Sequence, residues 1–296
     1  MIYLQRPWYN DPRSKHYSHD ALFGTISQFP ATLGRPIRPM EHQKNSTRCT
    51  GYGAAVNGGY IYGQRFHPDW QASKIGQIAG VSVDTGGSDP NSCMKSQRDY
   101  GYCPYESIPT ALSLERNTIE NTGMEVFGTS YDTAAEPYKG VGFVKVDGPL
   151  DLYGDIKSAL LLAYDPVGKQ GACVQAFGRW YYEWSNSPQG IVRNDYTAFA
   201  GYHHWLFVDW KTINGVEYLV AHNSYGYEQG DGGLYYFPRD IVNREFTLQN
   251  TSLKIMKILT EEQKAMIAKE TPIGQIWRVV AKIWYILSTL QYGRTH

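Results

Sequence analysis

Hydrophobic and polar residues follow two different patterns along the chain, and the change falls near residue 140. From about residue 43 to residue 114, apolar and small residues recur at helical spacing and are interrupted by glycines. One such run, CTGYGAAVNGGYIYG, begins at Cys49. A second helix is predicted over residues 90–100, with Gly101 as its C-cap. The first half of the chain therefore predicts a helical unit.

Beyond residue 140 the pattern is typical of short strands, which are rich in β-branched and aromatic residues and bounded by turn residues. One helix is expected among them, over residues 155–163. The expected strands cover residues 140–146, 172–177, 204–210, 217–222 and 234–237. Helices followed by strands predict an α+β fold, with a helical lobe over about residues 41–139 and a β lobe over about residues 140–250.

The two ends of the chain fit neither pattern. Residues 1–40 are rich in Pro, Arg and aromatics, and we expect an extended N-terminal arm that lies over the folded body or on a partner. Residues 251–296 are expected to form C-terminal helices. Within them, residues 276–290 are apolar at helical period, but Arg278 and Lys282 interrupt the run, which is shorter than the ~20 residues of a membrane span.

The ends are therefore the candidate contacts for other molecules. We expect residues 1–40 and 260–296 to contact a protein partner or a second copy of the chain, with a membrane-surface contact as the alternative for the apolar helix. Residues 1–10 lack the apolar core of a signal peptide. The 28 basic and 28 acidic residues of the 296-residue chain cancel, which argues against sequence-independent nucleic-acid binding.

Four residue types needed for acyl transfer occur in a suggestive order. Cys49 begins a helical run, where the partial positive charge of a helix N-terminus favours the thiolate. Gln43 precedes it by six residues and could supply an oxyanion donor. His203 and His204 open an apolar strand, and Asn223 ends the next one, so that a histidine and an orienting amide can lie side by side.

These stretches resemble the papain-like cysteine peptidases, and the bacterial or phage-type members in particular. The sequence Gln43-Lys-Asn-Ser-Thr-Arg-Cys49 is similar to the family's oxyanion Gln and nucleophile Cys, and Asn223-Ser-Tyr-Gly is similar to its Asn-Ser-Trp-Gly run. Gly86-Gly87 resembles the glycine pair that binds substrate backbone. The resemblance covers residues 33–242 and implies a papain-like domain over about residues 41–250, with a helical lobe and an antiparallel, β-barrel-like lobe.

The resemblance also assigns roles. It implies Cys49 as nucleophile, His203 as base, Asn223 as its orienting partner and Gln43 in the oxyanion hole. Tyr225 replaces the family's Trp, keeps an aromatic shield over the Asn and is expected, with Gly86 and Gly87, to bind substrate. His204 is the alternative base, and a regular strand would point the two histidines to opposite sides.

The function expected from this set is hydrolysis of peptide bonds in a peptide or protein substrate, without cofactor or metal, since no Cys or His pair has zinc-finger spacing. Cys93, Cys103 and Cys173 are expected to be bystanders, and so few cysteines favour a reducing cytoplasm or a virion. Two alternatives stay open. One is a cell-wall-degrading cysteine endopeptidase or amidase, and the other is a virion- or assembly-associated protein with a structural or binding role.

Overall fold

The computed structural model describes residues 29–43, 46–80, 88–109, 127, 129–140, 143–146, 151–246 and 252–255. The predicted Gly86-Gly87 pair, most of the N-terminal arm and nearly all of the predicted C-terminal helical extension lie outside these residues. The helices are α2 (Cys49–Tyr62), α3 (Pro68–Ala79), α5 (Pro90–Asp99), α7 (Thr129–Ala135), α8 (Leu152–Leu162) and α9 (Arg239–Glu245). The strands are β1 (Phe143–Val146), β2 (Tyr164–Asp165), β3 (Gln170–Gly171), β4 (Val174–Tyr181), β5 (Phe199–Ile213), β6 (Val216–His222), β7 (Leu234–Pro238) and β8 (Ser252–Ile255).

Local sequence explains where the helices of the first lobe begin and end. The His67 ring caps α3 by accepting from the N–H of Trp70, and the Asp89 carboxylate caps α5 by accepting from the N–H of Ser92. In both helices proline occupies the first turn, where its missing N–H costs nothing. Helix α2 ends at Gly63, whose φ of 79° is the left-handed conformation of a C-cap.

Helix α2 is the central helix of the molecule, and nearly all of its 14 residues are buried. Its small residues allow neighbours to approach from several sides. A Cβ on Gly51 would lie 2.6 Å from Cβ of Ala72 on α3, and one on Gly58 would lie 2.5 Å from the Tyr102 ring. The weakly amphipathic, glycine-rich sequence of α2 is therefore that of a helix packed all round.

The second lobe is built on a six-stranded antiparallel sheet with the order β1-β8-β4-β5-β6-β7. This is an open sheet, not a closed barrel. The long strand β5 passes into β6 through Asn214-Gly215, whose φ values of 50° and 79° suit a tight hairpin. Aromatic side chains fill the core of this lobe, among them Trp180, Trp184, Trp205, Trp210, Tyr235 and Phe237.

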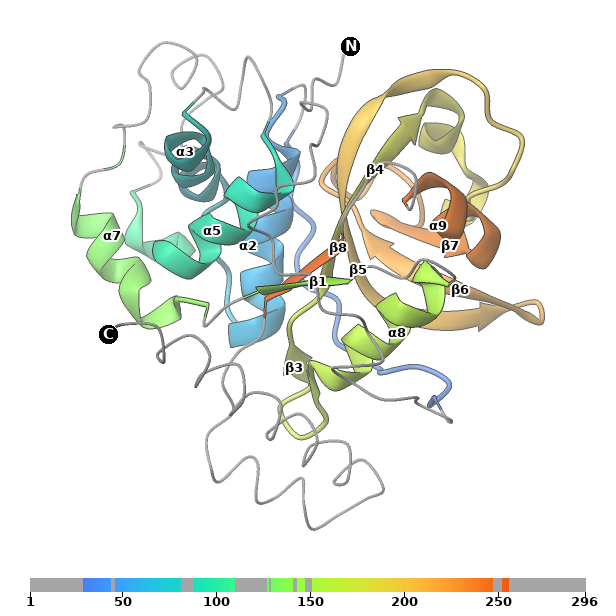
Figure 1. Ribbon diagram of the computed structural model, residues 1–296, viewed down its shortest axis with the longest axis horizontal. Coiled ribbons are helices and arrows are strands. Elements are labelled where there is room, and N and C mark those ends of the chain that lie inside the picture. The colour runs from blue at the N-terminus through green and yellow to red at the C-terminus, as the bar shows by residue number, and fades with distance from the viewer. Residues whose placement is uncertain are drawn as a thin grey trace, which may run out of the picture.

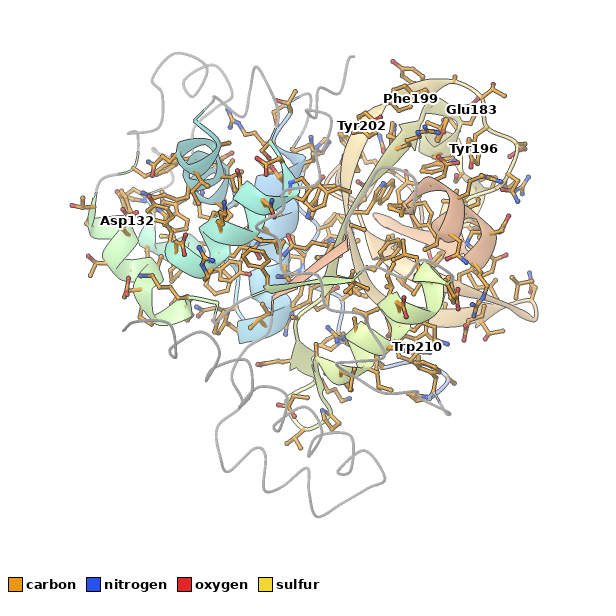
Figure 2. All side chains as sticks on the ribbon, in the orientation of Figure 1. Asp132, Glu183, Tyr196, Phe199, Tyr202 and Trp210 are labelled. Carbon is orange, nitrogen blue, oxygen red and sulfur yellow. The ribbon has the colours of Figure 1, made fainter. Side chains whose placement is uncertain are left out.

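The two lobes stand side by side, with α2, α3, α5 and α7 in one and the main strands with α8 and α9 in the other (Figure 1). Helix α2 lies on the inner side of its lobe and packs against β5. Strand β5 runs from Phe199 and Tyr202 at one end of the sheet lobe to Trp210 towards the other (Figure 2). The predicted two-lobe α+β architecture is thus confirmed.

Residues 252–255 correct one expectation. We placed them in a C-terminal helical extension, but they form β8, which pairs with both β1 and β4. The apolar residues of SLKI at positions 253 and 255 alternate with polar ones, and this period of two is that of a strand. Within the described ranges, no helix is long and apolar enough to cross a membrane.

Residues 29–43 form an extended strap that joins the two lobes. Its first part is held by Asp209 of β5, whose carboxylate accepts from Thr32 Oγ1 at 2.8 Å and from the N–H groups of Leu33 and Gly34 at 2.8 and 3.1 Å. Further along, Arg35 donates to carbonyl oxygens of Leu160, Gly171 and Ala172. The strap therefore arrives at residue 43 in a defined position.

Candidate active site

Cys49 is the first residue of α2, as the sequence predicted, and its side chain is 4% exposed. The preceding Arg48 provides no side-chain cap, because its guanidinium is buried in an ion pair with Asp69 at 2.9 Å. The first turn of α2 contains no acidic residue. A thiol here lies at the positive end of a helix with no acidic residue in the first turn to oppose that effect.

Gln43 is fixed by the loop that follows β6. Its N–H donates to the carbonyl of Ser224 at 2.7 Å, and its side-chain Oε1 accepts from the Ser224 hydroxyl. The amide Nε2 donates one hydrogen to the Ser46 carbonyl at 2.7 Å. An amide Nε2 carries two hydrogens, so Gln43, which is 2% exposed, has a second N–H beyond the one donated to Ser46.

His203 and Asn223 come together across two strands. His203 Nε2 lies 2.9 Å from Asn223 Oδ1, which also accepts from the N–H of Ser224 at 2.8 Å. Because this oxygen is an acceptor only, His203 Nε2 must carry the proton in the neutral ring. The Asn223 amide thus selects the tautomer in which Nδ1 has the lone pair that could take a proton from a thiol.

Aromatic rings surround the His203 side chain. Tyr225 stacks on it with 5.1 Å between ring centroids and 19° between planes, and Trp180 and Trp205 meet it edge-on at 5.3 and 5.1 Å. Burial lowers the pKa of His203 to about 4, and the hydrogen bond with Asn223 acts in the opposite direction. The sequence predicted Tyr225 as a shield over Asn223, and the structure stacks it on the His203 ring. Trp205 follows His203 by two residues on β5 and so lies on the same face, a signal that strand alternation could have given, whereas only the register of β4 and β5 brings Trp180 there.

His204 points to the opposite face of β5, as strand alternation predicted. Its Nε2 lies 3.0 Å from Gln175 Oε1, and its ring packs against Gly53 of α2. Burial first, and then the neighbouring His203, lower the pKa of His204 to about 3. The two adjacent histidines therefore have different partners: Asn223 for His203 and Gln175 for His204.

The remaining sequence candidates fall outside this arrangement. The structure gives no description of Gly86 and Gly87. All four cysteines belong to described residues and none is in a disulfide there. Burial raises the pKa of the Cys93 thiol well above its usual range and those of Cys103 and Cys173 to about 12, which makes these three poor nucleophiles. The described residues hold no cluster of His, Cys, Asp and Glu suited to a metal.

Comparison with known proteins identifies the fold. No family model matches the sequence, and no curated protein sequence matches it either. The structure is similar to that of xylellain, a cysteine protease from Xylella fastidiosa, with a TM-score of 0.64 and 17% identity over 87% of this chain and 96% of the other. It is also similar to procathepsin B from Trypanosoma congolense, with a TM-score of 0.61 and 15% identity over 87% of both chains.

A third structure of the same kind is bromelain from Ananas comosus, solved with the inhibitor E64, which has a TM-score of 0.53 and 12% identity over 78% of this chain and 100% of the other. These proteins are papain-like cysteine proteases. The chain therefore has the two-lobe α+β fold of the papain-like cysteine proteases.

Proposed function

We propose that this protein is a cysteine peptidase of the bacterial type, with Cys49, His203, Asn223 and Gln43 as its catalytic set. The observation that carries the proposal is the buried hydrogen bond between His203 and Asn223. His203 is on β5, the strand against which the Cys49 helix packs, and Asn223 directly follows β6. The papain-like fold supports it, because the structures with this fold named above are proteases.

The chemistry divides among these residues as follows. His203 Nδ1 takes the proton of the Cys49 thiol, and the thiolate attacks the carbonyl carbon of a peptide bond. The oxyanion that forms accepts from the second N–H of Gln43 and from the backbone N–H of Cys49 at the start of α2. One such donor contributes about 3 kcal/mol to transition-state stabilisation.

Collapse of the tetrahedral intermediate breaks the C–N bond, and His203 gives its proton to the leaving amine. Water, deprotonated by the same Nδ1, then hydrolyses the thioester and restores the thiol. Asn223 keeps the ring in one tautomer through both steps, and the aromatic rings around His203 keep bulk water away from that hydrogen bond.

The test replaces Cys49 by Ala and by Ser, with Cys103→Ala as a matched control at another buried thiol. We expect wild type and the control to hydrolyse casein and to be alkylated at Cys49 by iodoacetamide near pH 7. Both Cys49 variants should lose hydrolysis by a factor on the order of 10⁴ or more, because no other nucleophile replaces the thiolate.

The same variants, assayed on casein and on peptidoglycan, separate the competing functions. Hydrolysis of casein that survives Cys49→Ala contradicts the proposal. Activity on peptidoglycan but not on casein would instead identify a cell-wall-degrading enzyme. A folded wild-type protein that cleaves neither substrate and resists alkylation would favour a structural or binding role.

A further inference from the structure

A buried hydrogen-bond network connects the two lobes, and it includes His204, the residue next to the proposed base His203. On the sheet side, His204 of β5 pairs with Gln175 of β4 at 3.0 Å. Gln175 in turn forms a reciprocal amide pair with Gln97 of α5, through Nε2-to-Oε1 bonds of 2.8 and 3.2 Å. His204 is 2% exposed and the two glutamines are fully buried. The chain of contacts thus crosses from β5 to a helix of the other lobe without reaching solvent.

The network continues from Gln97 back to α2. Its Oε1 also accepts from the Tyr102 hydroxyl at 2.5 Å and from Asn57 Nδ2 at 3.2 Å. Asn57 lies on α2, and its Oδ1 accepts from the N–H of Cys173 just before β4, at 2.9 Å. Helix α2 and the sheet are therefore joined by directional bonds in addition to apolar packing.

His204 also touches the helix that carries the nucleophile. A Cβ on Gly53 would lie 2.0 Å from His204 Nδ1, so the imidazole rests directly on the α2 backbone. Gly53 is four residues after Cys49, one helical turn away. His204 is at the same time the chain neighbour of His203. The His204 side chain therefore contacts the helix that carries Cys49 and belongs to the strand that carries His203.

We propose that His204 is a positioning residue, which fixes β5 against α2 and so sets the placement of His203 relative to Cys49. This inference rests on the proposed peptidase function. The nucleophile and the base come from different lobes, and proton transfer between them is sensitive to displacements of about 1 Å. A hydrogen-bonded imidazole at this joint resists sliding of the lobes in a way that an apolar side chain of similar size does not.

The test compares His204→Phe, which fills the space but cannot donate to Gln175, with His204→Gln, which can. His67→Asn is the control, because His67 is an equally buried histidine that caps α3 within the helical lobe, and Asn preserves the cap. For each folded variant we would measure kcat, KM and the pH dependence of Cys49 alkylation by iodoacetamide, well below the melting temperature.

For His204→Phe we expect kcat to fall about 10- to 100-fold with KM nearly unchanged, since the loss concerns alignment and not substrate binding. The pH at which alkylation reaches half its maximal rate should rise, because the thiolate is less well paired with His203. His204→Gln should recover most of both properties, and His67→Asn should alter neither.

Several outcomes would overturn the inference. One is a folded His204→Phe protein with wild-type kcat and alkylation profile. Another is His204→Gln that is as inactive as Cys49→Ala, which would make His204 itself the base. If His204→Phe does not fold, Gln97→Met is the second test, because it removes the hydrogen bonds between α5 and Gln175 without altering β5. Wild-type kinetics of Gln97→Met would refute the positioning role of His204. A wild-type protein without Cys49-dependent hydrolysis refutes instead the proposed function.

Discussion

Asn223 has two acceptor bonds on a single oxygen, and this determines what its loss would do. Oδ1 holds His203 Nε2 on one side and the N–H of Ser224 on the other. The same amide therefore orients the imidazole and shapes the loop that fixes Gln43 through Ser224. A residue with these two contacts affects the proposed base, His203, and the proposed oxyanion donor, Gln43, together.

We predict that Asn223→Ala lowers kcat by about 100-fold while KM changes little, because the ring loses its preferred tautomer and orientation. Steady-state kinetics on a peptide substrate would measure this. Asn243→Ala is a matched control, because Asn243 accepts from the N–H of Tyr153 at the start of α8, in another part of the sheet lobe. Equal losses in the two variants would indicate general destabilisation in place of a role for Asn223.

At the scale of the element, α2 depends on close approach at Gly53. Helix propensity alone would favour Gly53→Ala by roughly 1 kcal/mol. The added Cβ would lie 2.0 Å from the buried His204 ring, however, and the ring cannot move without leaving Gln175. We predict that the substitution lowers the free energy of unfolding by about 1 to 3 kcal/mol, as overpacking does.

Gly59→Ala is the control within the same helix. There the nearest atom to an added Cβ is the Gln64 carbonyl oxygen at 3.2 Å, a contact that a shift of a few tenths of an ångström relieves. Urea denaturation should therefore find this variant near the wild type, within about 1 kcal/mol. If Gly53→Ala is as stable as Gly59→Ala, the close packing of His204 on α2 is not energetically important.

The elements themselves were largely predictable from the sequence. The helical start at Cys49, the proline-led helix α5 with Gly101 behind it, and strands β4 to β7 all follow from local patterns. Gln175 and Gln97 could not be foreseen as partners of His204, because they meet it only through strand register and lobe packing. Residues 252–255 were misassigned because their alternation, although it fits a strand, spans only four residues and was read together with the helical pattern that follows.

The strap over residues 29–43 leads to Gln43, and a prediction concerns Asp209, which anchors the strap to β5. The Asp209 carboxylate accepts hydrogen bonds from the Thr32 hydroxyl and from the N–H groups of Leu33 and Gly34. Asp209→Ala would leave these donors without their acceptor. Thr32 and Gly34 are exposed and can turn to water, whereas Leu33 is buried, so we expect a cost of about 1 to 3 kcal/mol.

We therefore expect Asp209→Ala to show a lower urea midpoint and faster proteolysis within the strap. We also expect reduced kcat, because Gln43 loses its anchored approach. Asp209→Asn keeps one carbonyl acceptor and should be intermediate. Unchanged proteolysis within the strap of the Ala variant would show that its other contacts, such as those of Arg35 with β3 and α8, suffice.

At the scale of the whole molecule, the four histidines that are buried among the described residues make stability depend on pH. Burial holds the pKa values of His67, His203 and His222 at about 4 and that of His204 at about 3. In the unfolded chain a histidine titrates near 6.5. Below that pH the unfolded state therefore binds protons that the folded state excludes, and stability present at neutral pH is lost as the pH falls from about 6.5 towards 4.

Each of these histidines steepens the fall by up to roughly 1.4 kcal/mol per pH unit, since one proton is taken up on unfolding. Urea unfolding at pH 7, 6 and 5 would measure the slope before most carboxylates begin to titrate. His67→Asn should reduce this slope by the contribution of close to one proton, whatever the substitution does to stability at pH 7. If the free energy of unfolding stays level between pH 7 and pH 5, these imidazoles take up protons in the folded protein as readily as in the unfolded chain. The interior around His203 and His204 would then have to be open to water.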